Sequence, residues 1–119
     1  MSDGFSKKEE ELVEKLIKTG LNKNVAKTLV YIAGRDEIKS REIESEIGLR
    51  QPEVSIAMQD LREKDWVAKR DIKKEGKGRP VHAYSLEKDI EEIIDEIEEE
   101  EKEKIAEIEE NIEKIKKLI

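Results

Sequence analysis

The 119-residue sequence contains no cysteine and only one histidine, His82. Without cysteine there is no disulfide, zinc ribbon, iron–sulfur cluster or thiol nucleophile. One histidine gives no basis for a histidine-rich metal site, so we expect neither a metal nor another cofactor. No apolar run approaches the ~18 residues that a membrane span needs, and residues 1–8 lack the apolar stretch of a signal peptide. We therefore expect a soluble, cytoplasmic protein with no membrane partner.

Motifs of enzyme active sites are also missing. The sequence has no P-loop, no G-x-S-x-G, no H-E-x-x-H and no Rossmann glycine pattern. The glycines at 76 and 78 fit the tip of a hairpin better than a phosphate loop. Carboxylates are abundant, but most fall on the outer faces of a predicted long helix rather than in a pocket that could separate their pKa values. We expect no catalytic residues and no enzymatic activity.

Charge is plentiful but unevenly distributed. The net charge of −7 combines −9 in residues 87–119 with +2 in residues 1–86. Within residues 1–86, the segment 69–79 alone carries a net charge of +4. Because electrostatic binding depends on the local field rather than the molecular sum, an acidic total does not exclude an acidic partner for this segment.

Apolar periodicity predicts four short helices in the first half of the chain. The first two span residues 7–19 and 22–33, and Gly20 and Gly34 end them. A third helix is predicted after a very short strand at Ile38, with Ser40 as its N-cap. Gly48 ends the third helix in a position that needs positive φ, and a fourth helix over residues 50–62 begins almost at once, with Pro52 in its first turn. Two helices joined by a short glycine-containing turn form a helix-turn-helix.

The fourth predicted helix has an unusual outer face. The only glutamines of the sequence, Gln51 and Gln59, flank Ser55 at four-residue steps, so all three line one side of the helix. This could be an ordinary solvated face. In a chain whose surface is otherwise Glu and Lys, however, an uncharged face that can donate and accept hydrogen bonds is suited to base edges. Ile56, one step around, could contact a thymine methyl or pack within the protein.

A basic hairpin is predicted next. Residues 66–74 and 81–86 are rich in strand formers, and two glycines and a proline lie between them. Trp66 is expected to anchor the core rather than to stack on a base, and His82 to have a structural or partly exposed role. The hairpin would rest on a phosphate backbone through its cationic side chains: Lys73, Lys74, Lys77 and Arg79.

From residue 86 onward the periodicity is that of a coiled coil. The predicted seam has a four-residue stutter at Glu101 and comprises Leu86, Ile90, Ile93, Ile97, Glu101, Ile105, Ile108, Ile112, Ile115 and Ile119. A helix of this length, ~50 Å at 1.5 Å per residue, needs a partner for its isoleucines. We expect a homodimer through the isoleucines of this seam from Ile90 to Ile119. Acidic residues dominate 89–101 and lysines lie further on, so an antiparallel pair is slightly favoured.

Two segments resemble known regulators. Residues 43–55, with the pattern Gly48-Leu49-x-Gln51-Pro52-x-Val54-Ser55, look like the helix-turn-helix of archaeal TrmB-like and ArsR/MarR-like winged-helix transcriptional regulators. Residues 78–86 resemble the Gly-Arg-Pro…Tyr-x-Leu return strand of the TrmB-like wing, and Thr19-Gly20-Leu21 fits the N-terminal part. The resemblance covers about residues 12–100. It implies DNA binding and dimerisation; the cysteines or histidines of metal-sensing members and the sugar-binding domain of longer members have no counterpart here.

The predicted architecture is mostly α-helical with a small β-hairpin. Residues 1–86 would form a winged helix-turn-helix domain and residues 87–119 a coiled-coil dimerisation helix. The predicted function is that of a transcriptional regulator that binds double-stranded DNA as a homodimer, with no effector indicated. Residues expected at the DNA are Arg50, Gln51, Ser55, Ile56, Gln59, Arg62, Lys73, Lys74, Lys77 and Arg79. The alternative is a winged-helix protein-interaction module of the transcription or chromosome machinery, in which the acidic coil binds a basic partner.

Overall fold

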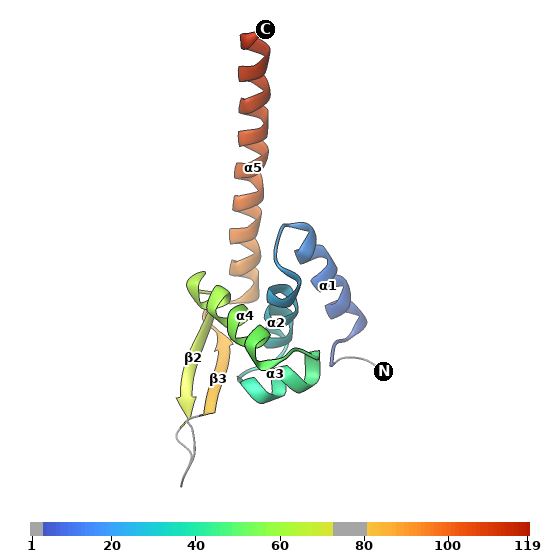
Figure 1. Ribbon diagram of the computed structural model, residues 1–119, viewed down its shortest axis with the longest axis vertical. Helices are drawn as coiled ribbons and strands as arrows, with labels where there is room; N and C mark the ends of the chain where they lie inside the picture. The colour runs from blue at the N-terminus through green and yellow to red at the C-terminus, as the bar shows by residue number, and fades with distance from the viewer. Residues whose placement is uncertain (1–3, 73–80) are drawn as a thin grey trace. The chain divides into compact units, whose positions relative to one another are not determined.

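The computed structural model describes residues 4–72 and 81–119 (Figure 1). The chain divides into two compact units, Met1–Asp89, called the head below, and Ile90–Ile119. In chain order the described elements are α1 (Lys7–Lys18), α2 (Lys23–Ala33), β1 (Ile38–Lys39), α3 (Ser40–Ile47), α4 (Gln51–Glu63), β2 (Val67–Ile72), β3 (Val81–Leu86) and α5 (Ile90–Leu118). The fold is thus mostly helical, with a small antiparallel sheet and a long C-terminal helix, as the sequence predicts at this coarse level.

The core of the head is built around α2. This helix contacts α1, α3, α4 and β3, and its Leu29 and Ile32 have no exposed surface. The neighbouring elements contribute further side chains that are at most 2% exposed: Ile38, Ile43, Met58, Leu61 and Trp66. Thr28, a buried polar residue, donates its hydroxyl to the carbonyl of Asn24 at 2.7 Å and so carries no unsatisfied group into the core.

The three strands form one sheet in the order β1-β3-β2, with both pairs antiparallel. In Figure 1, β2 and β3 lie side by side and α4 runs across the head beside them. The pairing of Val67 with Leu86 is continued by a bond from the Glu87 N–H to the Trp66 carbonyl at 2.8 Å. Leu86 is therefore the last residue of β3, and its predicted place in the helical seam is wrong; α5 begins at Ile90.

Helix starts follow local hydrogen bonding. Ser6 and Glu9 form a reciprocal capping box at the start of α1, and Asn22 caps α2. Ser40 was expected to cap α3, but this prediction is wrong: Lys39 is the extended residue before the helix, and no side chain caps it. The chain passes directly from β1 into α3, so the last strand residue takes the cap position.

Among the described residues, no helix combines the length and apolar character needed to cross a bilayer.

The turn between α3 and α4 depends on Gly48. Its φ of 68° and ψ of 31° are left-handed, as predicted, and its N–H bonds to the Glu44 carbonyl at 3.1 Å. A Cβ at this position would have no neighbour within 4 Å. Any loss of stability caused by a side chain at this position therefore comes from the left-handed backbone conformation, which costs an L-residue about 1–2 kcal/mol.

Replacing Gly48 by alanine should lower the free energy of unfolding by about 1–2 kcal/mol. Urea denaturation followed by circular dichroism measures this. Gly48→Asn is the matched control. Asparagine adopts the left-handed conformation more readily than alanine, so this variant should lose less stability than Gly48→Ala. Equal stability of the glycine and alanine proteins would contradict the role given to this turn.

Candidate nucleic-acid interface

The rotation of α4 about its axis decides which of its side chains reach the surface. Val54, Ala57, Met58 and Leu61 are buried, so the opposite side faces outward. The exposed polar residues of that side include Gln51, Ser55, Gln59 and Arg62. The structure therefore places together on one helix surface four of the residues that the sequence assigned to DNA.

The register of the β2–β3 pair adds a second group of side chains. Lys69 lies opposite Tyr84, and Asp71 lies opposite His82. Directly paired residues of antiparallel strands project from the same face of a sheet. His82 Nδ1 lies 2.7 Å from the Asp71 carboxylate, which holds the imidazole beside Tyr84.

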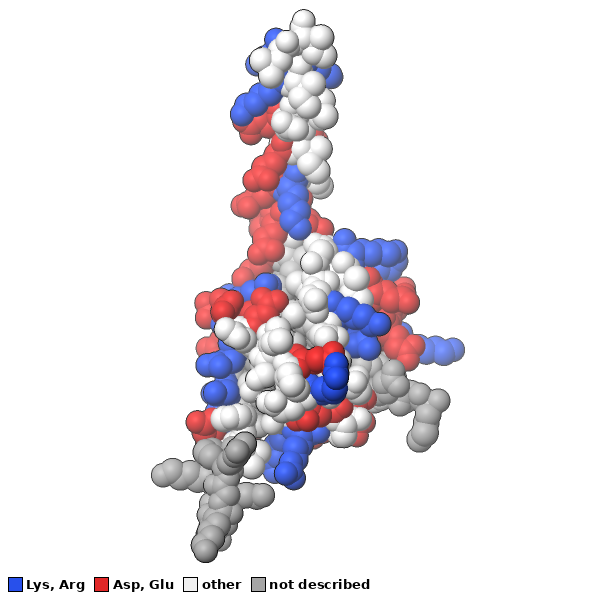
Figure 2. All heavy atoms as spheres, viewed as in Figure 1, with Lys and Arg blue, Asp and Glu red and all other residues white. Residues whose placement is uncertain are grey.

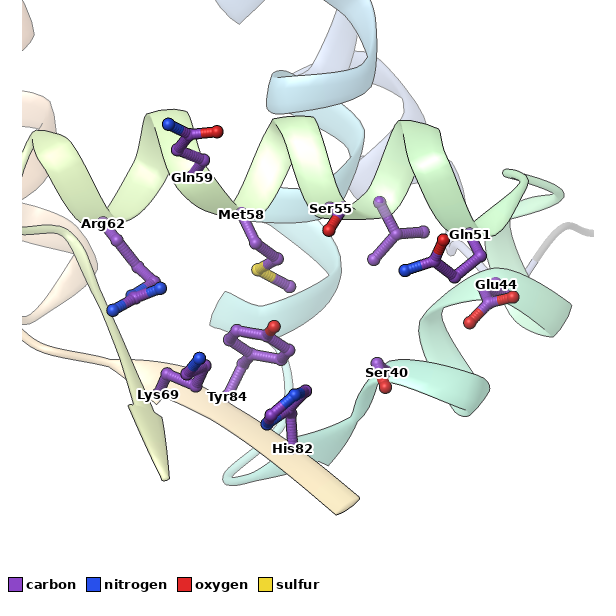
Figure 3. Close-up of a pocket in the computed structure, with 11 residues that line it drawn as sticks. Ser40, Glu44, Gln51, Ser55, Met58, Gln59, Arg62, Lys69, His82 and Tyr84 are labelled. Carbon is purple, nitrogen blue, oxygen red and sulfur yellow. The ribbon is translucent and has the colours of Figure 1, made fainter. Parts of the chain in front are cut away.

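These two groups line a cleft of about 370 Å³ between α4 and the sheet (Figure 3). Met58 and the ring of Tyr84 project into it, and Arg62 and Lys69 extend toward each other at one end. Gln51, Glu44 and Ser40 lie at the other end. The full lining is Ser40, Glu44, Gln51, Val54, Ser55, Met58, Gln59, Arg62, Lys69, His82 and Tyr84.

Several cations of α4, β2 and the turn between them already have an anionic partner. Arg70 donates two hydrogen bonds to Glu37, at 2.6 and 3.0 Å, and this pairing lowers the pKa of Glu37. Lys64 lies 2.8 Å from Asp60. Arg62 and Lys69, by contrast, form no ion pair with any other described residue. The end of the cleft between them is consequently its most positive region.

Arg50 is the N-cap residue of α4, and its side chain is strongly exposed. Its backbone N–H donates to Glu53 at 2.9 Å, and its guanidinium lies 3.6 Å from the same carboxylate. The backbone hydrogen bond lowers the pKa of Glu53. Glu53 thus stabilises the first turn of the helix, and Arg50 remains available to an external anion only in competition with it.

Ile56 is 69% exposed but lies apart from the cleft. It lines a second hollow of about 210 Å³, whose other members include Asn24, Glu53 and Asp60. The two sides of α4 therefore differ: amides, a hydroxyl and cations face the sheet, and carboxylates face the beginning of α2. An anionic partner would be favoured on the sheet side.

Four predicted DNA-binding residues, Lys73, Lys74, Lys77 and Arg79, lie outside the described residues. Sequence reasoning counted Lys69 only toward the hairpin charge and did not assign Ser40, Tyr84 or His82 to a binding surface. Strand alternation indicates which hairpin residues share a face, but the register that sets Lys69 against Tyr84 depends on the turn between the strands.

Among the described residues, no three His, Asp or Glu side chains converge as a metal site.

The seam predicted along α5 is only partly exposed. Ile93 and Ile97 are buried in the single chain and Ile90 is half-buried. The exposed isoleucines are Ile105, Ile108, Ile112, Ile115 and Ile119. Figure 2 shows uncharged atoms along one side of this part of α5 and charged atoms along the other. Glu101, at the stutter, pairs with Lys104 of its own helix at 2.9 Å.

No protein-family model matches the chain, and no curated protein matches it significantly. The chemistry of the surface formed by α4 and the sheet is therefore the basis on which a function can be assigned.

The electrostatics of the cleft can be tested through Tyr84. Burial raises the pKa of its hydroxyl, the charge of Arg62 opposes this, and the carboxylate of Asp71 adds to it. Arg62→Ala should raise the Tyr84 pKa further, and Asp71→Asn should lower it. Ring-carbon NMR measures both shifts during a pH titration.

Tyr31, the other tyrosine, serves as the internal reference in this titration. Burial and a 2.9 Å hydrogen bond to Glu42 raise its pKa to about 12, and it does not line the cleft. Shifts of the same sign in both variants would contradict the proximity of Arg62 to the Tyr84 hydroxyl.

Proposed function

We propose that this protein is a homodimeric transcriptional regulator that binds double-stranded DNA through a winged helix, with α4 in the major groove. The order of helices and strands, with the sheet order β1-β3-β2, is consistent with a winged helix. The likeness of residues 43–55 and 78–86 to TrmB-like and ArsR/MarR-like regulators supports the same assignment.

The observation that carries the proposal is the surface of α4 itself. In a chain that is 46% charged, its sheet-facing side presents Gln51 and Ser55 beside Arg62 and, across the cleft, Lys69, neither of which forms an ion pair with another described residue. Amide and hydroxyl groups both donate and accept hydrogen bonds, as base edges in the major groove require. Cations beside them supply the attraction to phosphates that positions a protein on a duplex.

Each residue of this surface has a distinct proposed role. Gln51, Ser55 and Gln59 contact base edges, and Ile56, exposed on the neighbouring side of α4, contacts a thymine methyl. Arg50 and Arg62 reach phosphates on the flanks of the groove. The net charge of +4 in residues 69–79 supplies further, sequence-independent backbone contacts.

Dimerisation is assigned to α5. Its exposed isoleucines repeat at three- and four-residue spacings, which is the pattern of a coiled-coil seam. Burying each of them is worth roughly 1.5–3 kcal/mol. A second copy of the same helix provides a matching apolar stripe, and two heads would then bind two half-sites, as dimeric helix-turn-helix proteins do.

Selection of bound fragments from random duplex DNA at stated salt concentrations tests the proposal as a whole. Two short sites in a palindromic arrangement are expected. With about four phosphates neutralised per protomer at ~0.9 each, log affinity should fall with log salt at a slope near −7. Binding of a basic protein without enrichment of any duplex would instead favour the protein-interaction module.

Replacing Gln59 by alanine should reduce sequence discrimination by about tenfold, in the range of one base contact of 1–3 kcal/mol, while binding to random duplex stays unchanged. Gln59→Glu is the matched variant, because a carboxylate of the same shape should weaken binding to every duplex. Competition binding with selected and random duplexes distinguishes the two. An unaltered preference in Gln59→Ala would remove this residue from the groove.

The dimer can be tested by Ile108→Lys together with Ile112→Lys, which places two charges in the exposed seam and should yield monomers. Glu107→Lys with Glu113→Lys makes a larger change in net charge outside the seam and should leave the dimer intact. Sedimentation equilibrium measures the molecular mass, and so the oligomeric state, of each double variant. A dimer that survives the isoleucine changes would place the interface elsewhere.

A further inference from the structure

We propose that the cleft between α4 and the sheet is a phosphate-binding site that seats one phosphodiester of the duplex, held by Arg62, Lys69 and the hydroxyl of Tyr84. This inference rests on the proposed function and deepens it, because it assigns a contact to two residues of the sheet. One ligand group comes from each of α4, β2 and β3.

Two observations favour an anion at this end of the cleft. Arg62 and Lys69 come from different elements and converge (Figure 3), although neither forms an ion pair with another described residue. Like charges that approach each other without a counter-ion repel, so an anion between them removes an unfavourable interaction. The arginine fork and the lysine ammonium are both suited to phosphate oxygens.

Tyr84 contributes the third donor. Its ring is buried, yet its side chain lines the cleft, and no buried polar side-chain atom among the described residues lacks a partner. The hydroxyl therefore meets the solvent of the cleft. Arg62 lines the same cleft, and its positive charge opposes the rise in the Tyr84 pKa that burial causes. A rigid phenol loses little conformational entropy when it binds.

The opposite end of the cleft disfavours an anion. Glu44 lies there, next to Ser40 and Gln51. The two ends of the cleft therefore differ in charge, and a phosphate is attracted to the Arg62–Lys69 end. Since Gln51 and Ser55 line the same cleft, a strand whose phosphate is seated there passes beside the groups proposed to read base edges.

The test combines protein variants with chemically altered DNA. Arg62→Ala with Lys69→Ala should weaken binding to the selected duplex about tenfold, the loss of one charge-assisted contact, and make the salt slope less negative by about 0.9. Lys15→Ala with Lys18→Ala is the matched control, because it removes the same charge from α1 and should change neither quantity as much. Tyr84→Phe keeps the ring and should weaken binding about threefold.

A scan of the selected duplex with single neutral methylphosphonates identifies the phosphate. At one position per half-site, the methylphosphonate should weaken the unaltered protein but cause no further loss in the Arg62/Lys69 variant. Glu44→Gln should tighten binding to the unmodified duplex by about twofold, the size of a screened single-charge effect.

The outcomes separate the inference from the proposed function. If the selected duplex is recognised but no methylphosphonate position is coupled to Arg62 and Lys69, or if the control pair has an equal effect, the phosphate site is refuted and DNA binding stands. If inorganic phosphate shifts the Lys69 and Tyr84 NMR signals at micromolar concentration while no duplex position is coupled, the occupant is a free phosphate compound, which also refutes the inference. If the unaltered protein enriches no duplex, both fall.

Discussion

Burial of α2 is the constraint on which the arrangement of the head depends. Seven of its 11 residues are buried, so it can be accommodated only where α1, α3, α4 and β3 surround it. Packing against this helix fixes the rotation of α4, because Ala57 and Leu61 must face the core. The side of α4 that carries Gln51, Ser55 and Gln59 is then directed outward, because the apolar residues occupy the positions that face the core. Core packing and the composition of the outer surface are thus two consequences of one periodic pattern.

This dependence explains which features the sequence predicts. Helix positions follow from apolar periodicity, and the conformation of Gly48 follows from a requirement that few other residues satisfy. The N-cap of α3 could not be predicted in this way. Lys39 takes the cap position because it ends a strand, and the chemistry of its side chain does not identify it as a cap. Leu86 fits both the end of a strand and the first position of a heptad; only the partner strand decides between them. The cleft depends on strand register and helix rotation together, so its residues could be foreseen on α4 but not on the sheet.

Counting charges along the sequence also overstates the cations available to a ligand. Arg70 is occupied by Glu37, Lys64 by Asp60, and Arg50 shares Glu53 with the start of its own helix. Exposed pairs of this kind contribute little to stability, but each one reduces the local positive field. Arg62 and Lys69 matter for the opposite reason: they stand in a cleft and form no ion pair with another described residue. Which lysine or arginine acts on an anion is therefore decided by pairing, which only the folded chain reveals.

Ion pairs within α5 also bear on the orientation of the proposed dimer. Lys102, Lys104 and Lys114 pair with carboxylates three or four residues earlier on α5, so these lysines already neutralise their own helix. Every charged residue from 91 to 101 is acidic, and a parallel pair in register would set these segments against each other. The preference for an antiparallel pair then arises from repulsion avoided rather than from ion pairs across the seam. Repulsion between exposed charges is screened within about 10 Å at 0.1 M salt, so orientation should be set mainly by charge in dilute buffer and by isoleucine packing as the salt concentration rises.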